Sequence, residues 1–308
     1  FDGYSFCKPH SASYARVSFQ AAFLKVHHPA EFMAAVISNQ GGFYSAFAYV
    51  SEARRMGRAV LPPEANTSEV RWTGKGAALR VGFLSVKGLS AEARERIVGG
   101  RQKRRYAGVG DFLERVRPDA SELRALVHCG ALDRLAPGAS RAELLWEATR
   151  RLQLRPAACS RLLFAEPMDD ARIPRLPPDD ARERLRREFA VLGFLCDRHP
   201  MELYTDTVRR LGAVKAVDLP QWIGRKVRFA GWLITGKVVA TRRGEPMEFL
   251  TFEDETGLVE TTFFPEAYRR FCHLLDRGRP YLLSGKVEED WGAVTLTVEA
   301  VSLLAVPV

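Results

Sequence analysis

The sequence lacks the features that would place the chain in a membrane, in an oxidising compartment or around a structural metal. No run approaches the ~20 apolar residues that span a bilayer, and the N-terminus shows no signal-peptide pattern. The five cysteines are an odd number without a CxxC pair, and none lies at metal-ligand spacing from another cysteine or a histidine. These absences favour reduced thiols in a cytoplasmic protein.

Motifs of common catalytic centres are missing as well. The sequence contains no GxSxG, no HExxH and no Walker loop. Two acidic clusters, AspGluThr (254–256) and GluGluAsp (288–290), bring carboxylates together as a two-metal site requires. Both are expected at strand ends, where acidic turns are common, so we predict solvated loops. We therefore expect no catalytic residue and no metal site in this chain.

The net charge of +9 is concentrated in the first third of the sequence. Residues 1–115 hold 17 Lys and Arg against 9 Asp and Glu. Residues 116–220 hold 18 against 16, and residues 221–308 hold 11 against 12. A polyanionic partner is therefore expected at the front of the chain, although charge that serves only solubility gives the same count.

Helical spacing dominates the N-terminal region. Between residues 13 and 38 apolar and small residues recur at helical intervals, and Pro29 breaks the pattern, which predicts two helices joined near His28. A third helix is expected after a turn at 41–45, with Gly57 as its C-cap.

A glycine turn then separates two short elements. LysGlyLeuSer (87–90) follows a strand-like run at 79–86 and precedes a helix from Ala91 to about Val98. A glycine turn lets the backbone approach a phosphate closely, and the amides that open the next helix point at it. Such contacts hold a duplex without reading its sequence. A turn with solvated arginines is the alternative.

A second helical pair makes a tandem helix-hairpin-helix over residues 76–135 the favoured interpretation. It comprises 111–116 and 121–132, with HisCysGly (128–130) at its turn, although it could serve only to pack the first pair. The predicted DNA contacts of this region are the first hairpin and the basic side chains after it: Lys87, Gly88, Ser90, Arg94, Arg101, Lys103 and Arg104.

Residues 136–220 are expected to form a helical linker region. Residues 136–180 are rich in proline, arginine and aspartate, and 174–180 is the best linker candidate. A strong helix is predicted over 181–194.

From residue 221 the pattern changes to that of strands. The β-rich runs are 227–241, 247–255, 258–265, 280–288 and 293–301, and a helix at 267–276 follows the third. Three strands, a helix and two strands is the order of an OB-fold, a partly open barrel that binds single-stranded nucleic acid or oligosaccharide.

Strand alternation puts about half of the barrel's aromatic side chains inside it. The candidates are Phe229, Trp232, Phe249, Phe252, Phe263 and Phe264. Lys237, with Arg242 and Arg243 in the loop 241–245, is predicted to follow a nucleic-acid strand. Because phosphate neutralisation supplies non-specific affinity, the near-zero charge of this region indicates a weak, accessory role.

Long blocks of the sequence resemble the bacterial C-family DNA polymerases, which include the polymerase III alpha subunit. The blocks occur in the family's order at 1–39, 54–57, 61–66, 81–90, 126–133, 192–195 with 198–200, and 244–257. The resemblance is weakest over 136–180, and the stretch 41–45 is closer to the error-prone paralogue.

The resemblance implies a multidomain α+β chain with four parts. Residues 1–75 would be the C-terminal part of the fingers, 76–135 the tandem helix-hairpin-helix, 136–220 the helical linker region and 221–308 the five-stranded OB-fold barrel. The catalytic palm, with its Mg²⁺, would lie before Phe1. The chain would then be a C-terminal portion of a nucleotidyltransferase, inactive alone.

The resemblance also gives roles to the first ten residues. Tyr4 would stack near the incoming base, while Lys8 and His10 would approach the triphosphate of a dNTP. From residue types alone, a helix start in which Tyr4 packs inward and His10 caps is the alternative. The family's sliding-clamp segment is in doubt here, because residues 162–166 depart from a glutamine-led motif.

Two other function classes stay open. A non-catalytic accessory protein of repair or recombination could be built from the same modules and bind the same DNA. An oligosaccharide-binding OB protein is disfavoured by the basic front and the glycine hairpin.

Overall fold

The computed structural model describes residues 8–40, 44–153, 176–177 and 180–304, which fold into two compact units. The helical unit comprises Phe1–Gly41 and Glu52–Asp197, and the barrel unit comprises Gly42–Ser51 and Arg198–Val308. Among the helices of these described ranges, none combines the length and apolar character needed to cross a bilayer. The four-part division expected from the sequence is finer than these two units and stays a prediction.

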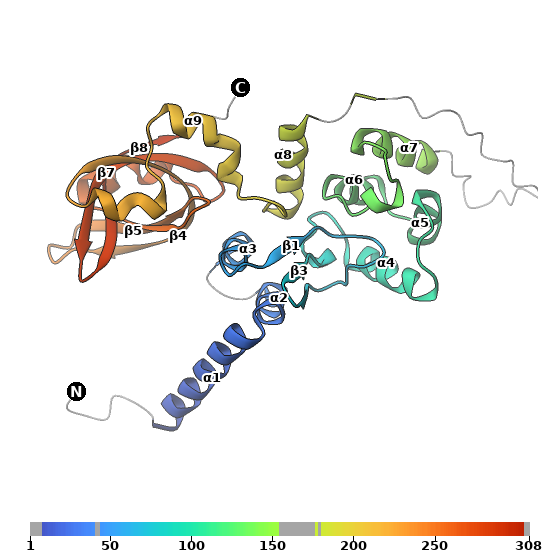
Figure 1. The fold of residues 1–308 in the computed structure, drawn as a ribbon, viewed down its shortest axis with the longest axis horizontal. Helices are drawn as coiled ribbons and strands as arrows, with labels where there is room; N and C mark the ends of the chain where they lie inside the picture. Colours follow the sequence, from blue (N-terminus) through green and yellow to red (C-terminus); the bar gives the residue numbers. More distant parts are fainter. Residues whose placement is uncertain (1–7, 41–43, 154–175, 178–179, 305–308) are drawn as a thin grey trace, which may run out of the picture. The chain divides into compact units, whose positions relative to one another are not determined.

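The front of the chain forms the three helices predicted from its periodicity. They are α1 (Lys8–His27), α2 (Pro29–Asn39) and α3 (Ala46–Arg55). Pro29 opens α2 at a position where its missing amide costs no helical hydrogen bond. Gly57 has the left-handed φ of +72° that ends α3. In Figure 1, α1 projects away from the other helices of the helical unit.

A three-stranded sheet follows, with strand order β1-β3-β2. Its strands are β1 (Ala59–Leu61), β2 (Thr73–Lys75) and β3 (Ala78–Arg80). The strand-like run expected at 79–86 was only partly right, because β3 ends at Arg80 and the 3₁₀ turn η1 (Phe83–Ser85) follows. The hairpin at 87–90 therefore joins two helical elements rather than a strand and a helix.

The remaining helices of this unit pack around a shared core. They are α4 (Ala91–Lys103), α5 (Val109–Val116), α6 (Ala120–His128), α7 (Arg141–Gln153) and α8 (Ala181–Leu192), with the 3₁₀ turn η2 (Asp133–Leu135) before α7. Their fully buried side chains include Ile97, Phe112 and Leu126. Figure 1 shows α4 to α7 gathered together.

One expectation for this unit needs correction. HisCysGly (128–130) is not the turn of the second pair: it ends α6, where Cys129 is the C-cap and Gly130 has a φ of +80°. The turn between α5 and α6 is 117–119. Within the predicted helical linker region, residues 141–153 form α7, and Leu144 and Ala148 bury one face of this helix. The clamp candidate 162–166 lies outside the described residues, as does most of the linker candidate 174–180.

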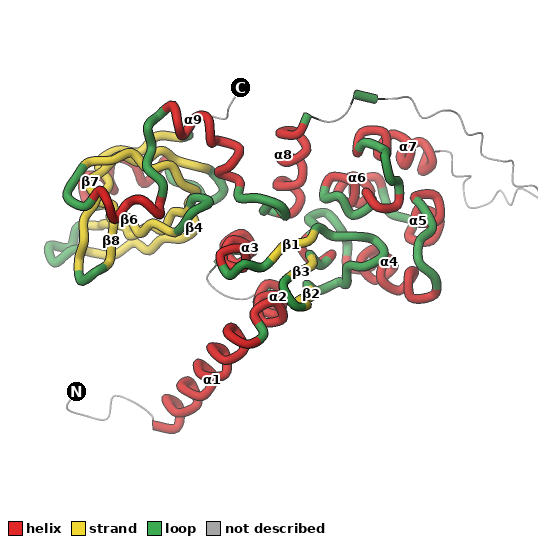
Figure 2. The backbone as a smooth tube through the Cα atoms, viewed as in Figure 1, coloured by secondary structure: helices red, strands yellow, loops and turns green. Residues whose placement is uncertain are grey.

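The barrel unit contains the predicted OB-fold order. Its strands are β4 (Lys226–Ala240), β5 (Pro246–Glu253), β6 (Leu258–Phe263), β7 (Pro280–Asp290) and β8 (Ala293–Leu303), with α10 (Pro265–Phe271) and the 3₁₀ turn η5 (Cys272–Leu274) after the third strand. The barrel is closed, in the order β4-β5-β6-β8-β7, because β6 pairs in parallel with β8 (Figure 2). The predicted five-stranded barrel is confirmed, and it is closed rather than partly open. The short helices η3 (Pro200–Tyr204), α9 (Thr205–Arg210) and η4 (Ala216–Trp222) precede it.

Four of the six candidate aromatic side chains are buried within the barrel unit. Phe229, Trp232, Phe252 and Phe263 are buried, while Phe249 and Phe264 are 43% and 48% exposed. Tyr281 joins the core, and its hydroxyl donates to the carbonyl of Leu274 at 2.9 Å. Because successive side chains of β5 point to opposite faces, Phe249 faces solvent while Phe252 faces the core.

The cluster at 254–256 is not the solvated loop expected from the sequence. Asp254 is only 2% exposed. Its Oδ2 accepts the amide of Ala216 at 2.9 Å, and its Oδ1 accepts the amides of Thr256 and Gly257 at 2.7 and 3.0 Å. A buried carboxylate that accepts three backbone amides is a structural group. The second cluster, 288–290, does face solvent at Glu289 and Asp290.

A buried carboxylate also organises the start of the barrel unit. Glu253 Oε1 accepts the hydroxyl of Ser51 at 2.7 Å and lies 3.0 Å from Nε2 of His199. The other ring nitrogen of His199 accepts the amide of Met201 at 3.1 Å, so Nε2 carries the proton and donates to Glu253. Phe47 packs 5.5 Å from the same imidazole. The network thus ties α3 and η3 to β5.

Candidate nucleic-acid interfaces

The first hairpin has the predicted backbone shape, but its helix start is already paired. Gly88 has a φ of +82°, and the Ser90 hydroxyl caps α4 by accepting the amide of Ala93 at 3.1 Å. Glu122 of α6 accepts the Ser90 hydroxyl at 2.5 Å and the Ser90 amide at 3.3 Å. A phosphate at this helix start would meet the charge of Glu122, so Ser90 acts here as a structural cap.

The second hairpin, the turn 117–119 between α5 and α6, also places a carboxylate at the start of the following helix. Asp119 caps α6 by accepting the amides of Ser121 and Glu122 at 2.7 and 2.8 Å. The hydrogen bond from the Glu122 amide is the main cause that lowers the pKa of Asp119. Its charge is therefore present at neutral pH. Since both helix starts carry a carboxylate, side-chain cations are the better candidates for phosphate binding in this unit.

The structure places Arg101 away from solvent. Its side chain is 8% exposed, donates to the carbonyls of Ala65 and Ser68, and pairs with Glu69 at 2.5 Å. A phosphate contact by Arg101 would require these bonds to break. Arg94 is partly buried as well, and its Nε has no hydrogen-bond partner among the described residues.

Three of the five cations predicted for the helix-hairpin-helix region are exposed. Lys87 lies at the first hairpin, and Lys103 and Arg104 lie at the C-terminal end of α4. Arg104 pairs with Asp111 at 3.0 Å. The Asp111 carboxylate accepts the amide of Ala107, which is the main cause that lowers its pKa. Lys103 is thus the predicted cation that opens onto the groove described next.

A groove of about 810 Å³ lies between α4 and α5. Its lining residues are Glu95, Arg96, Gly99, Gly100, Lys103, Glu114, Arg115 and Arg117. Sequence reasoning predicted only Lys103 among them. The sequence signal for the α4 side of the groove was the spacing of Arg96, Gly99, Gly100 and Lys103, which puts these four residues on one helical face.

The two adjacent glycines of α4 have different surroundings. A Cβ added to Gly100 would lie 2.3 Å from the Tyr106 hydroxyl, so internal packing requires this glycine. A Cβ added to Gly99 would have no atom within 4 Å. Glycine in a helix interior costs roughly 1 kcal/mol relative to alanine. The packing of the described residues therefore gives no reason for glycine at position 99.

Two of the three N-terminal candidates lie on α1. Lys8 and His10 are exposed in its first turn, and the His10 ring meets the Tyr14 ring edge-on at 5.2 Å. His10 is the third residue of α1, so it does not occupy a cap position. Tyr4 lies outside the described residues.

A row of outward side chains crosses the strands of the barrel. In the strand register, Lys237 on β4 pairs with Phe249 on β5, and Phe249 pairs with Thr262 on β6. Thr262 pairs with Thr297 on β8, which pairs with Lys286 on β7. We call these five residues the outer row. It presents one exposed aromatic ring between hydroxyl and ammonium groups.

The loops beside this row add further exposed groups. Arg242 and Arg243 occupy the tip of a tight turn, where the amide of Gly244 donates to the carbonyl of Thr241 at 2.9 Å. Trp291, at the turn between β7 and β8, is 99% exposed and was missed by sequence reasoning. The sequence signal for an exposed turn residue here was the TrpGly pair between two β-rich runs. Loops in these two positions bind oligonucleotides in OB-folds.

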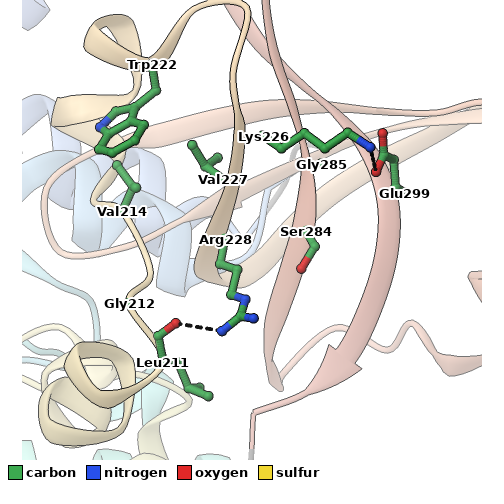
Figure 3. A pocket seen from close by; sticks show the side chains of 10 residues that line it. All are labelled: Leu211, Gly212, Val214, Trp222, Lys226, Val227, Arg228, Ser284, Gly285 and Glu299. Atoms are coloured by element: carbon green, nitrogen blue, oxygen red, sulfur yellow. Dashed lines mark hydrogen bonds and ion pairs between the residues drawn. The ribbon is translucent and has the colours of Figure 1, made fainter.

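Another groove, of about 550 Å³, lies in the barrel unit where β4 meets β7 (Figure 3). Figure 3 shows that its two cations are engaged: Arg228 donates to the carbonyl of Leu211 at 3.1 Å, and Lys226 pairs with Glu299 at 2.8 Å. None of the predicted contact residues lines it.

No metal centre is found among the residues that the structure describes. In those ranges, no group of three or more His, Cys, Asp or Glu side chains could hold a metal ion. The Mg²⁺ implied by the resemblance therefore has no donor set in the described part of the chain.

Comparison with known families matches both kinds of module. Residues 57–144 match the helix-hairpin-helix motif, and residues 227–304 match the OB-fold nucleic acid binding domain. The first match includes α4 to α6, and the second covers all five barrel strands. Both support binding of nucleic acid.

Whole-chain relatives are DNA polymerases by name. The chain is 30% identical to an error-prone DNA polymerase of Symbiobacterium thermophilum and 32% identical to one of Corynebacterium efficiens, each over 99% of this chain. It is 30% identical to the DNA polymerase III subunit alpha of Aquifex aeolicus over 94% of this chain. These matches confirm the resemblance to the C-family. The chain spans 32%, 28% and 24% of the length of these three relatives.

Proposed function

We propose that this chain is the DNA-binding portion of a bacterial DNA-directed DNA polymerase of the polymerase III alpha or error-prone type. The observation that carries the proposal is similarity to such polymerases along 94–99% of the chain. The helical unit would hold duplex product through side-chain cations, and the barrel unit would receive single-stranded template. Nucleotidyl transfer would be the activity of the whole protein.

The outer row supports single-strand binding by the barrel unit. Base stacking needs an exposed aromatic face, and a sequence-independent contact needs cations near the backbone. Phe249 provides the ring, and Lys237 and Lys286 lie at the two ends of the row. Glu288 accepts the Thr297 hydroxyl at 2.6 Å and pairs with Lys286 at 3.4 Å, which limits the affinity of the row for phosphate.

Replacing Phe249 with alanine is expected to weaken single-strand binding by about 1–3 kcal/mol, the value of one base–aromatic stack. Fluorescence anisotropy of a labelled oligothymidine at low salt measures this change. The matched control is Phe264→Ala, because Phe264 is similarly exposed but lies at the start of α10, off the outer row. Equal affinities for wild type and Phe249→Ala would contradict the assignment of the row.

The N-terminal residues are proposed to contact the incoming nucleotide. A cation near a triphosphate stabilises the charge that develops during phosphoryl transfer, and Lys8 and His10 are exposed on α1. Tyr4 would stack on the base. This part of the proposal is supported by the resemblance of residues 1–39 to the fingers block of the family.

In an intact polymerase that contains this sequence, His10→Ala is expected to raise the KM for dNTP while leaving DNA affinity unchanged. Steady-state primer extension over a dNTP series measures both quantities. His27→Ala, an exposed histidine at the other end of α1, serves as the control. An unchanged KM for dNTP in His10→Ala would remove His10 from the nucleotide site.

Three further elements belong to the proposal. Mg²⁺ would be held by the polymerase outside the described residues. A sliding clamp is a candidate partner, and the cytoplasm is the expected location. The second candidate function, a non-catalytic accessory protein of repair or recombination, is favoured only by the shared helix-hairpin-helix and OB-fold modules.

A further inference from the structure

We infer that the groove between α4 and α5 binds the phosphodiester backbone of duplex DNA, with Gly99 as its point of closest approach. This inference rests on the proposed function and deepens it. It places a phosphate contact on the face of α4, beside the hairpin turns.

The charge and spacing of the groove suit a phosphate strand. Arg96 and Lys103 lie seven residues apart on one face of α4, which separates them by ~10.5 Å along the helix. That distance is the rise of about three base pairs at 3.4 Å per step. Arg115 and Arg117 line the opposite side, so four cations face two carboxylates, those of Glu95 and Glu114.

Two of these cations are held in place by the fold. Arg96 Nε donates to the carbonyl of Val116 at 2.7 Å, and its Nη2 lies 3.7 Å from Glu122. Arg115 pairs with Asp111 at 3.0 Å and stacks over the Tyr106 ring at 4.5 Å. Their guanidinium groups are therefore positioned before any ligand arrives, which lowers the entropy cost of binding.

Gly99 provides a second and independent observation. It lies between Arg96 and Lys103 on the groove face, it weakens the helix, and no neighbour among the described residues requires it. Glycine allows the close approach of an external backbone. Gly99 is thus an open position on α4 with a groove-lining cation on either side, Arg96 before it and Lys103 after it.

The lining residues also argue against other occupants. A protein partner is expected to bury aromatic or large apolar anchors, and the groove lining contains no such side chain. A single strand would gain from aromatic stacking platforms, and these are absent from the same lining. Contacts to the backbone of a duplex need only cations and close approach.

The test uses Gly99→Ala in the full chain, with two readouts. We expect the melting temperature to rise by about 2 °C, because alanine stabilises the helix. We expect affinity for a blunt fluorescent duplex to fall about tenfold, the effect of losing one charge-assisted contact. A higher melting temperature together with a lower duplex affinity identifies a ligand contact, because damage to the fold would lower both. Gln102→Ala, on the exposed surface of α4 outside the groove, is the matched control and should keep wild-type affinity.

A second variant tests the charge. Lys103→Gln should weaken duplex binding and reduce the salt slope by about one phosphate contact. Lys75→Gln, an exposed cation on β2, should change neither quantity.

The outcomes distinguish the groove from the proposed function. If wild type binds duplex and both Gly99→Ala and Lys103→Gln bind equally well, the inference that the groove binds the DNA backbone is overturned and the proposed function stands. An equal loss in Gln102→Ala, or a loss confined to single-strand binding, also overturns the groove. If wild type itself binds no duplex, the proposed function fails and the groove fails with it.

Discussion

Raising the monovalent salt concentration from about 50 to about 200 mM is expected to weaken duplex binding by this chain about a hundredfold. Each neutralised phosphate releases condensed counterions, and the logarithm of affinity falls with the logarithm of salt by ~0.9 per phosphate. Four cations line the groove between α4 and α5, and a fourfold rise in salt then gives about this loss. Anisotropy titrations of one duplex over a salt series measure the slope.

Single-strand binding by the same chain should show a smaller salt slope. Residues 221–308 hold 11 Lys and Arg against 12 Asp and Glu, and the proposed contact depends on stacking at Phe249. The two titrations share all conditions apart from the probe, so each serves as the control for the other. A duplex slope near zero would contradict electrostatic binding of duplex by the helical unit.

Replacing Glu253 with alanine is expected to destabilise the barrel unit by about 2–5 kcal/mol. The substitution removes the acceptor of the Ser51 hydroxyl and of the His199 Nε2–H, and both donors are buried. Each buried donor left without a partner costs about 1–3 kcal/mol. Urea denaturation followed by tryptophan fluorescence measures the loss, since Trp232 lies in this unit and packs 5.8 Å from Phe47.

Two controls separate the network from general effects of substitution. Glu253→Gln keeps an acceptor oxygen, so its loss of stability should be clearly smaller. Glu289→Ala removes a carboxylate that faces solvent and should change the free energy of unfolding by less than about 0.5 kcal/mol. If Glu253→Ala were as stable as Glu289→Ala, the buried network would contribute nothing to stability.

The barrel could be predicted from the sequence because strand alternation and turn residues are local signals. The five β-rich runs agree closely with the five strands, and the helix after the third strand is in its predicted place. The same alternation separates Phe249 from Phe252 on β5. Closure of the barrel depends on parallel pairing between β6 and β8, which no local pattern encodes.

The details of the candidate sites could not be predicted, because they depend on partners far apart in the sequence. Ser90 was expected to face a phosphate, yet its partner Glu122 lies 32 residues away. Asp254 was expected in solvent, yet the amide that it accepts from Ala216 lies 38 residues away. Arg101 resembles its basic neighbours in sequence, and only tertiary packing against Ala65 and Ser68 removes it from the surface.

The measurement that tests the central claim most directly is equilibrium binding of this chain to a fluorescent primer–template, with blunt duplex and single strand of the same sequence as controls. At one moderate salt concentration, the proposed function predicts that both duplex-containing probes bind more tightly than the single strand. Absence of binding, or binding confined to the single strand, would contradict a duplex-gripping helical unit and leave the barrel unit as the only nucleic-acid contact to consider.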